Sequence, residues 1–324
     1  MSERVLPSLL LERSQCLAPP LFILGDIHGQ LERLEALLQA LGYQQDEAGW
    51  FHPTHHTLFV GDLIDRGPGQ RQVLDLVRQM VDRGKAAVVM GNHEFNAIGW
   101  ASEHPPGSGN FLRHHSHRNR HQHKAFLEAF DGDDVAYASW IAWFKRLPLF
   151  MAYADLRVIH ACWEDEAITR LLPYLDEHGA LQDQYWPAAF DEQHELFSLL
   201  ETLLKGPELP LPDGVVFQDK DGNHRTTSRI RWWRPHGGSW QEMVVMSAQQ
   251  ARHLPDLPIP MQHSLYQGCV PVIVGHYWLV GEPELLSPVV ACVDYSAAAE
   301  HGKLVAYEWR GGKSLQVENF HWLR

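Results

Sequence analysis

Three short apolar runs in the first third of the chain each end on a glycine that is followed at once by an aspartate or asparagine. The runs are LFIL, TLFV and AAVVM, and the segments that follow are GDIHG at 25–29, GDLIDRG at 61–67 and GNHE at 91–94. Apolar runs of this length, bounded by turn residues, are typical of buried strands. Periodic leucines and valines predict a helix at 31–42 and another at 70–84. The alternation of strand, loop and helix predicts an α/β fold with parallel strands.

The spacing of these loops predicts where their side chains meet. Asp26 and Asp62 are 36 residues apart, and Asp62 and Asn92 are 30 residues apart, which in each case is the length of one strand-helix-strand unit. Because such units place the carboxyl ends of neighbouring strands at one edge of a sheet, we expect Asp26, His28, Asp62 and Asn92 to lie together.

Two histidines that follow later apolar runs are expected to join these four residues. Strands are expected at 149–153, 156–160, 270–275, 289–295 and 303–309, and His160 and His276 stand at the ends of two of them. Aspartates that cap helices and core histidines would explain any one motif, but five motifs in this order favour a metal site. Carboxylate and imidazole ligands without thiolates indicate manganese, iron or zinc. The number of ligands suits two divalent ions, with Asp62 placed to bridge them.

Charge and composition exclude several classes of protein. The 324 residues include 27 lysines and arginines against 40 aspartates and glutamates, a formal net charge of −13. This balance argues against a nucleic-acid phosphodiesterase and against any stable nucleic-acid partner. Four cysteines without Cys-x-x-Cys spacing favour a reducing compartment. Because no apolar run reaches the ~20 residues of a membrane helix, and no signal peptide is recognisable, we expect a cytoplasmic protein without membrane contact.

The series GDIHG, GDLIDRG, GNHE, VIHA and VGHYW resembles the motifs of calcineurin-like metallophosphoesterases, specifically the phosphoprotein-phosphatase branch that includes bacterial enzymes. The resemblance is specific over residues 25–94 and sparser afterwards. It implies an α/β fold in which two mixed β-sheets form a sandwich flanked by α-helices. It also implies two metal sites, the first formed by Asp26, His28 and Asp62, and the second by Asp62, Asn92, His160 and His276.

The resemblance also implies roles for residues that bind no metal. Arg66 corresponds to an arginine that grips phosphate oxygens together with Asn92, and a planar guanidinium suits that task. His93 corresponds to the general acid, oriented by Asp65, while a metal-bridging hydroxide attacks phosphorus in line. The family's second phosphate-binding arginine is assigned to Arg231, within SRIRWWRP. We expect a structural role for Glu94 and no catalytic role for Asp294.

The substrate is expected to be a phosphorylated molecule, either a phosphoprotein or a small phosphoester or nucleotide. The intact DRG and GNHE segments resemble those of protein Ser/Thr phosphatases, which favours a phosphomonoesterase that uses two divalent ions, most simply manganese, with iron or zinc as alternatives. A hydrolase of dinucleoside polyphosphates, similar to bis(5'-nucleosyl)-tetraphosphatases, is the alternative. A catalytically silent regulatory protein is a further one, although such a protein should have lost a ligand and none is missing here. The sequence predicts no oligomeric state.

A single domain over 1–324 is expected, with insertions at about 104–124 and 207–240. The histidine-rich segment RHHSHRNRHQHK at 113–124 suggests a solvated, mobile insertion, and a third metal site or a lid that grips substrate are the alternatives. Alternation along a strand would place Arg229, Arg231 and Trp233 on one face. The tryptophans are expected in the core or in a cleft wall rather than on a platform for nucleobases, namely Trp140, Trp143, Trp232, Trp233 and Trp240.

Overall fold

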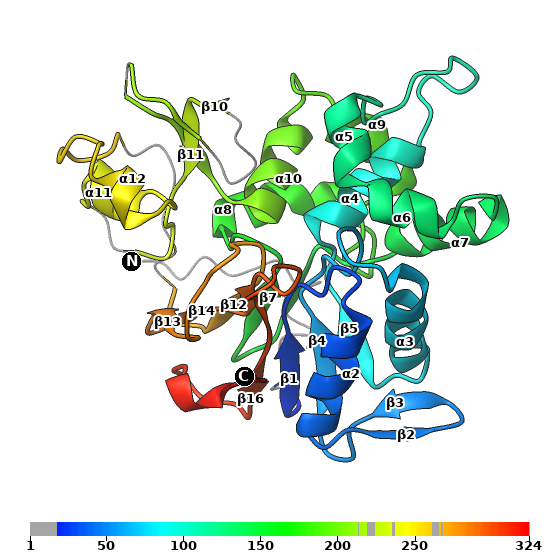
Figure 1. The fold of residues 1–324 in the computed structure, drawn as a ribbon. Helices are drawn as coiled ribbons and strands as arrows, with labels where there is room; N and C mark the ends of the chain where they lie inside the picture. The colour runs from blue at the N-terminus through cyan, green and yellow to red at the C-terminus, as the bar shows by residue number, and fades with distance from the viewer. Residues whose placement is uncertain are drawn as a thin grey trace.

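Two mixed β-sheets form the centre of the computed structural model, as expected from the sequence (Figure 1). The structure describes residues 18–212, 214–218, 224–234, 237–260, 266 and 268–323. In the first sheet, β1 pairs in parallel with β4 and antiparallel with β16. Its strand order is β15-β16-β1-β4-β5, with β17 paired to β16. The bounds are β1 Leu21–Leu24, β4 His56–Phe59, β5 Ala86–Val88, β15 Asp294–Tyr295, β16 Lys303–Trp309 and β17 Phe320–Trp322.

The second sheet has the order β13-β14-β12-β7-β6. Strand β12 pairs in parallel with β7 and β14, and antiparallel strands close both edges. The bounds are β6 Phe150–Ala152, β7 Arg157–Ile159, β12 Val272–Val274, β13 Leu285–Ser287 and β14 Val290–Cys292.

Side-chain alternation along the strands explains why the sheets stack. In β1, Leu21 and Ile23 belong to an apolar cluster that also contains Val158 of β7 and Ile273 of β12. The intervening side chains of β1 point the other way, into a second cluster that contains the helices. Because successive residues of a strand face opposite sides, a strand that is apolar throughout must be covered on both faces. The first cluster is therefore the interior of the sandwich.

Amphipathic helices cover the outer face of the first sheet, at the positions that the sequence predicted. Helix α2 (Leu31–Ala40) buries Leu34, Leu37 and Leu38, and α3 (Gln70–Asp82) buries valines and leucines at the same spacing. The other helices are α4 Asn92–Ala101, α5 His117–Gln122, α6 Lys124–Ala129, α7 Asp134–Phe144, α8 Asp165–Leu171, α9 Trp186–Ala189, α10 Glu195–Lys205, α11 Trp240–Met243 and α12 Ala248–Ala251. None of the described helices has the length and apolar character needed to cross a membrane.

The segment at 207–240 forms short antiparallel pairs beside the sandwich. These pairs are β8 Glu208–Pro210 with β11 Thr227–Arg229, and β9 Phe217–Gln218 with β10 His224–Arg225; a separate hairpin joins β2 Gln44–Asp46 and β3 Gly49–Phe51. Residues 219–223, which separate β9 from β10 in the sequence, lie outside the described residues. In Figure 1, β10 and β11 lie on the opposite side of the molecule from α5, α6 and α7.

Two elements end where the chain turns. Helix α8 stops at Leu171, because Pro173 lacks an amide hydrogen and the chain passes into a 3-10 turn. The strand expected to run through Trp233 stops near Arg229, because the chain turns there and the Arg234 amide donates to the Arg231 carbonyl at 3.0 Å. The prediction that Arg229, Arg231 and Trp233 share a strand face is therefore wrong.

Candidate metal centre

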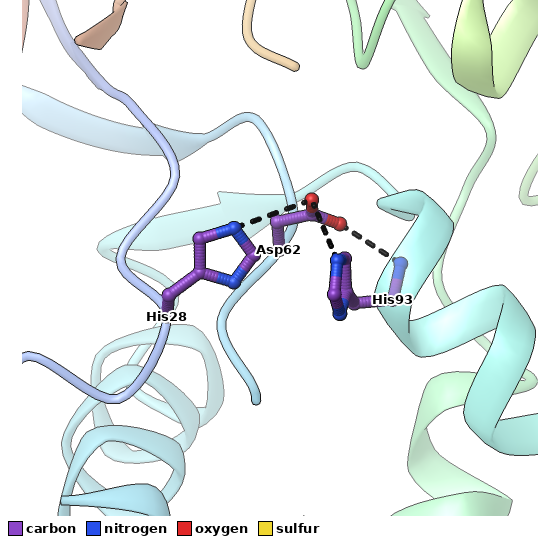
Figure 2. Close-up of side chains that lie close together, drawn as sticks. All are labelled: His28, Asp62 and His93. Atoms are coloured by element: carbon purple, nitrogen blue, oxygen red, sulfur yellow. Dashed lines mark hydrogen bonds and ion pairs between the residues drawn. The ribbon is translucent and has the colours of Figure 1, made fainter. Parts of the chain in front are cut away.

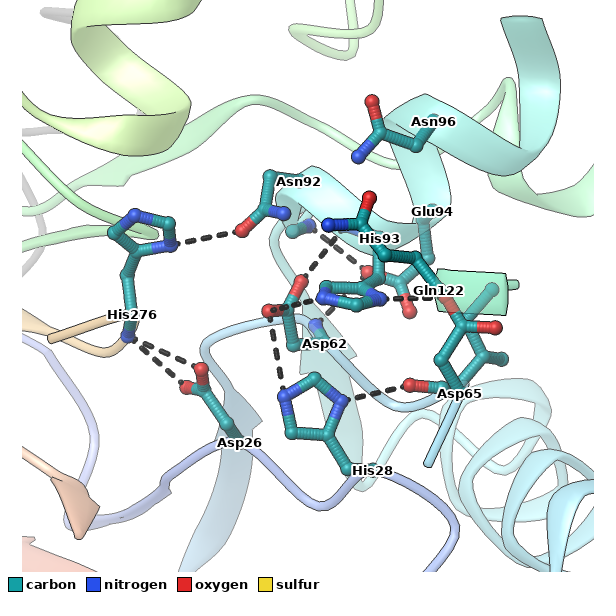
Figure 3. A network of polar contacts seen from close by, with 12 residues as sticks. Asp26, His28, Asp62, Asp65, Asn92, His93, Glu94, Asn96, Gln122 and His276 are labelled. Atoms are coloured by element: carbon teal, nitrogen blue, oxygen red, sulfur yellow. Dashed lines mark hydrogen bonds and ion pairs between the residues drawn. The ribbon is translucent and has the colours of Figure 1, made fainter. Parts of the chain in front are cut away.

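Five loops at the carboxyl ends of strands bring the predicted ligands to one edge of the sandwich. The loops follow β1, β4, β5, β7 and β12, and Figure 3 shows side chains from several of them converging. All six predicted ligands are buried: Asp26, His28, Asp62, Asn92, His160 and His276. Residues separated by up to 250 positions in the sequence thus meet, as the α/β pattern led us to expect.

Two groups of side chains could each hold an ion, and Asp62 belongs to both. In one group, His28 Nε2 lies 3.7 Å from Asp62 Oδ2 and His93 Nε2 lies 3.9 Å from the same oxygen (Figure 2). In the other group, which includes His276, Nε2 of His160 lies 3.5 Å from Asp62 Oδ1. Asp62 is therefore the residue that the two groups share, and its bridging of two ions stays a prediction.

The placement of Asp26 differs from that of the other acidic ligand. Its two carboxylate oxygens lie 3.1 and 3.3 Å from the backbone amide of His276, which donates to them. The first compact group contains His93 at the place where the family resemblance implied Asp26. Asp26 is thus tied by hydrogen bonds to the loop that carries His276.

Hydrogen bonds to backbone carbonyls orient two of the imidazoles. His28 Nδ1 lies 2.8 Å from the Ile64 carbonyl oxygen and His160 Nδ1 lies 2.7 Å from that of Val60. A carbonyl oxygen only accepts, so Nδ1 of each ring carries a hydrogen, and Nε2 of the His28 ring keeps a lone pair. Three buried atoms of the predicted ligands have no hydrogen-bond partner among the described residues: His28 Nε2, Asp62 Oδ2 and His276 Nε2. Uncompensated buried lone pairs of this kind fit divalent metal ions.

The electrostatics of the site favour a cation. Burial, with a contribution from His93, lowers the pKa of His28 to about 3, and burial also holds the pKa of His276 well below its usual value. Neutral imidazole is the form that binds metals. Burial and the nearby charges of Asp294 and Asp62 raise the pKa of Asp26 well above its usual value. A bound cation would relieve this accumulation of buried negative charge.

The backbone of these loops adopts strained, left-handed conformations at several of the site residues. Seven residues other than glycine have a positive φ within the described part of the chain, and five of them are His28, Asp62, Asp65, Arg66 and His276. Such conformations are costly for residues with a Cβ atom and cluster at functional sites. The loops that carry Asp62 and Gly91 also approach each other closely. A Cβ atom added to Gly91 would lie only 2.2 Å from the Asp62 amide nitrogen. The glycines of the motifs make this contact possible.

Glu94 supports the loops without lying in either metal group. Its carboxylate accepts hydrogen bonds from the backbone amides of Asp62 and Leu63, both at 2.8 Å, and of Gly91 at 3.1 Å. These contacts agree with the structural role that was expected for Glu94.

His93 and Asp65 form the pair that the sequence suggested. His93 Nδ1 lies 2.5 Å from Asp65 Oδ2. Burial by itself would raise the pKa of Asp65, but interactions with His123 and His93 outweigh it and hold this pKa well below its usual value. The carboxylate therefore remains ionised and accepts from both imidazoles. Sequence reasoning had not assigned His123 to the site, and its only signal was its place in the histidine-rich segment.

The histidine-rich segment is only partly solvated. Its outward residues, such as Arg120 and His121, are exposed on α5, as expected. The prediction of a solvated, mobile insertion is wrong for the inner side, where His123 is 5% exposed and bonds to Asp65. Arg113 also turns inward and bonds to Asn96, Asn119 and Gln122. The segment that leads into α5 is held to α4 by the bond from Arg113 to Asn96 and by the stacking of His115 on Trp100.

A cleft of about 780 Å³ opens from the metal centre. Arg66, Asn92, His93 and His276 line its inner end, and the guanidinium carbon of Arg66 lies 3.6 Å from the ring centroid of Trp278. Four more arginines line the cleft: Arg225, Arg229, Arg231 and Arg234. Of the tryptophans considered in the sequence, Trp233 lines the cleft, Trp143, Trp232 and Trp240 are buried and Trp140 is partly buried, as expected.

Arg231 and Arg229 face different surroundings within this cleft. Arg231 donates to the backbone carbonyl of Glu242 at 3.1 Å. The charge of Arg229 assists burial in lowering the pKa of His276, so this guanidinium acts on a histidine of the metal centre. The phosphate-binding role of Arg231 stays a prediction, and Arg229 is a second candidate for it.

Comparisons with known proteins agree with this geometry. The family model described as calcineurin-like phosphoesterase matches residues 19–189, more than half of the chain. The asymmetrical bis(5'-nucleosyl)-tetraphosphatase PrpE of Oceanobacillus iheyensis is 46% identical over 72 residues, which are 22% of this chain and 29% of that protein. The symmetrical bis(5'-nucleosyl)-tetraphosphatase of Vibrio cholerae is 33% identical over 141 residues, 43% of each chain. This chain thus spans less than half the length of these relatives.

The fold also resembles that of a solved eukaryotic enzyme. A protein serine/threonine phosphatase from Saccharomyces cerevisiae superposes with a TM-score of 0.51 over 98% of this chain and 85% of that one, at 13% identity. At this identity the similarity concerns the fold alone, and it agrees with the two-sheet architecture described above.

Proposed function

The chain belongs to the calcineurin-like phosphoesterase family, and on that premise we propose that it is a metal-dependent hydrolase of phosphoric esters or anhydrides. The support lies in the six buried ligand residues and in the buried, unpartnered atoms His28 Nε2, Asp62 Oδ2 and His276 Nε2. A degenerate, regulatory member of the family should lack a ligand, and all six predicted ligand residues are present.

Two divalent ions fit the residues described. Asp26, His28 and Asp62 would hold one ion, and Asp62, Asn92, His160 and His276 would hold the other, with manganese as the first choice for this oxygen and nitrogen set. When bound, such ions activate water and neutralise charge on a phosphoryl group.

The protein side chains provide binding and proton transfer. Arg66 lines the inner end of the cleft, where its planar guanidinium can hold two phosphoryl oxygens, and Trp278 restrains it by stacking. His93 donates through Nδ1 to Asp65, which leaves Nε2 for proton exchange with a leaving group. Arg229 or Arg231 would bind a second phosphoryl group.

A substrate with several phosphates in a row suits this cleft better than a simple phosphomonoester. The observation that carries this proposal is the set of four arginines that share the cleft with the metal-centre residues: Arg225, Arg229, Arg231 and Arg234. A single phosphoryl group needs one or two such partners, whereas a polyphosphate chain can engage the whole set. Phe217 lines the same cleft and offers a face for a nucleobase. Dinucleoside polyphosphates, the substrates named for the two bacterial relatives, are therefore proposed.

A protein phosphatase activity is the second candidate. The openness of a cleft of about 780 Å³ and the intact DRG and GNHE segments favour it. A phosphoserine or phosphothreonine side chain would reach Arg66 and His93 while leaving most of the arginines unused.

A substrate panel separates the candidates. Manganese-loaded protein is assayed with diadenosine tetraphosphate, p-nitrophenyl phosphate, and phosphoserine, phosphothreonine and phosphotyrosine peptides, with Asp62→Asn as the control. We expect diadenosine tetraphosphate to give the highest kcat/KM. Higher values for phosphopeptides would establish the second candidate, and no turnover of any substrate by metal-loaded protein would support a regulatory role.

A further inference from the structure

We propose that His123 is a positioning residue that holds Asp65, and through it His93, in the geometry needed for proton transfer. The proposal rests on the proposed hydrolytic function, and it assigns a task to the histidine-rich segment. His123 belongs neither to the metal groups nor to the residues that line the cleft, so its effect on the reaction would pass through Asp65.

The two histidines bind different oxygens of one carboxylate. His123 Nδ1 lies 2.8 Å from Asp65 Oδ1, and His93 Nδ1 lies 2.5 Å from Oδ2. An ionised carboxylate only accepts, so both Nδ1 atoms donate. Two donors on opposite oxygens fix the rotation of the carboxylate about its Cβ–Cγ bond. The orientation of Asp65 thereby restricts the ring of His93.

The surroundings of His123 leave it one polar partner. His123 is 5% exposed, and the centroid of its ring lies 5.0 Å from that of Phe126 and 6.0 Å from that of Trp100. Its Nε2 has no hydrogen-bond partner among the described residues. Burying an imidazole among aromatic rings is costly unless a hydrogen bond compensates it. The bond to Asp65 supplies that compensation.

The segment that carries His123 is attached to the helix that carries His93. Arg113 bonds to Asn96 on α4 and, at 3.0 Å each, to Asn119 and Gln122 on α5. The His123 amide donates to the Asn119 carbonyl at 3.1 Å, which continues the turn of α5. The backbone of His123 is therefore fixed by its own hydrogen bond to Asn119 and by the contacts of the residues before it. A residue that positions another must itself be fixed in this way.

Two substitutions of His123 test the proposal. His123→Phe keeps a ring beside Trp100 and Phe126 but removes the donor, whereas the Nδ2–H of His123→Asn can replace Nδ1–H. We expect His123→Phe to lower kcat about 10-fold for a substrate with a poor leaving group, such as a phosphoserine peptide, with KM and metal content unchanged. The loss with p-nitrophenyl phosphate should be smaller, and His123→Asn should recover most of the activity.

Controls separate positioning from general destabilisation. His121→Phe, on the exposed side of α5, should leave kcat unchanged. In a His93→Ala background, His123→Phe should have no further effect on kcat, because its action passes through His93. Equal losses for both leaving groups, a further loss in that background, or no recovery in a folded His123→Asn variant would overturn the proposal.

A spectroscopic measurement makes the test independent of activity. Proton NMR of metal-free protein should show downfield imidazole N–H resonances from His93 and His123 beside those of the other hydrogen-bonded histidines, and the variants His93→Ala and His123→Phe assign them. His123→Phe should remove one of them and shift the other. An unshifted His93 resonance would refute the coupling through Asp65. If wild-type protein turns over no substrate but the shift is observed, the proposed function fails while the contact stands.

Discussion

The carboxylate of Glu94 accepts a hydrogen bond from the backbone amide of Asp62 at 2.8 Å, and Asp62 is the residue common to both groups of potential metal ligands. The same carboxylate accepts from Gly91, so it ties the loop after β4 to the loop after β5. A residue outside both metal groups thus fixes the distance between two ligand-bearing loops.

We therefore expect Glu94→Ala to weaken metal binding although it removes no predicted ligand. Three buried amides would lose their acceptor, at about 1–3 kcal/mol for each group left unsatisfied. Calorimetric titration with manganese and thermal unfolding should both show a loss relative to wild type. Glu47→Ala, at an exposed position, is the matched control, and an unchanged manganese affinity in a folded Glu94→Ala variant would contradict the prediction.

Asp62→Asn should reduce the binding of both ions, because one oxygen of this residue faces each group. Metal analysis of dialysed protein should find less than one ion per chain, and the increase in melting temperature on adding manganese should largely disappear. Asp82→Asn, an exposed residue paired with Arg78, serves as the control. Full retention of one ion would show that Asp62 does not bridge.

His93→Ala should leave metal content unchanged and reduce turnover. General acid catalysis typically contributes about 10²–10⁴-fold, and a poor leaving group depends on it most. The ratio of kcat values, variant to wild type, should therefore be lower for a phosphoserine peptide than for p-nitrophenyl phosphate. Similar ratios for both substrates would remove His93 from the role of the acid, and a loss of metal would assign it to the metal group that also contains His28.

Arg66→Lys should fail to replace arginine. The guanidinium of Arg66 lies 3.6 Å from the Trp278 ring centroid, and an ammonium group provides neither this planar stacking nor two-pronged binding of phosphate. We expect KM to rise about 10-fold or more in steady-state assays, with unchanged metal content. Arg78→Lys, on the surface of α3, should have no effect on KM. Wild-type kinetics for Arg66→Lys would show that charge alone suffices.

The pair of His55 and Glu308, outside the metal centre, should give the protein an acid-sensitive component of stability. His55 Nε2 lies 2.9 Å from Glu308 Oε1. Burial acts to raise the pKa of Glu308, but Arg310 and His55 lower it below its usual value. A carboxyl group with a depressed pKa in the folded state contributes stability above the unfolded pKa of about 4.3, and this contribution disappears as the pH falls through the folded pKa.

Glu308→Gln should therefore lose less stability than wild type below about pH 4.3. Urea unfolding of metal-free protein between pH 3 and 6 measures the difference, and Glu300→Gln at an exposed position is the control. Parallel pH profiles for wild type and Glu308→Gln would refute the contribution of the pair.

Local sequence patterns were sufficient for much of the fold and for the ligand set. The leucine spacing predicted a helix at 31–42, and α2 ends two residues earlier, at Ala40. The prediction succeeded because helix periodicity depends on residues that are close in the sequence. Asp26, Asp62 and Asn92 could be placed together because parallel strands separated by helices always bring their carboxyl ends to one edge. The single-domain organisation with two insertions stays a prediction.

Tertiary packing decided which further side chains contact the site residues predicted from the sequence. His123 is 58 residues from Asp65 in the sequence, and nothing in RHHSHRNRHQHK distinguishes it from the exposed His121 nearby. The direction of Arg231 likewise depends on a turn that ends β11. Backbone hydrogen bonding and residue periodicity are local, and therefore readable from sequence. The placement of residues 113–123 beside α4 depends on the combined contacts of distant segments, and this placement brought His123 to Asp65.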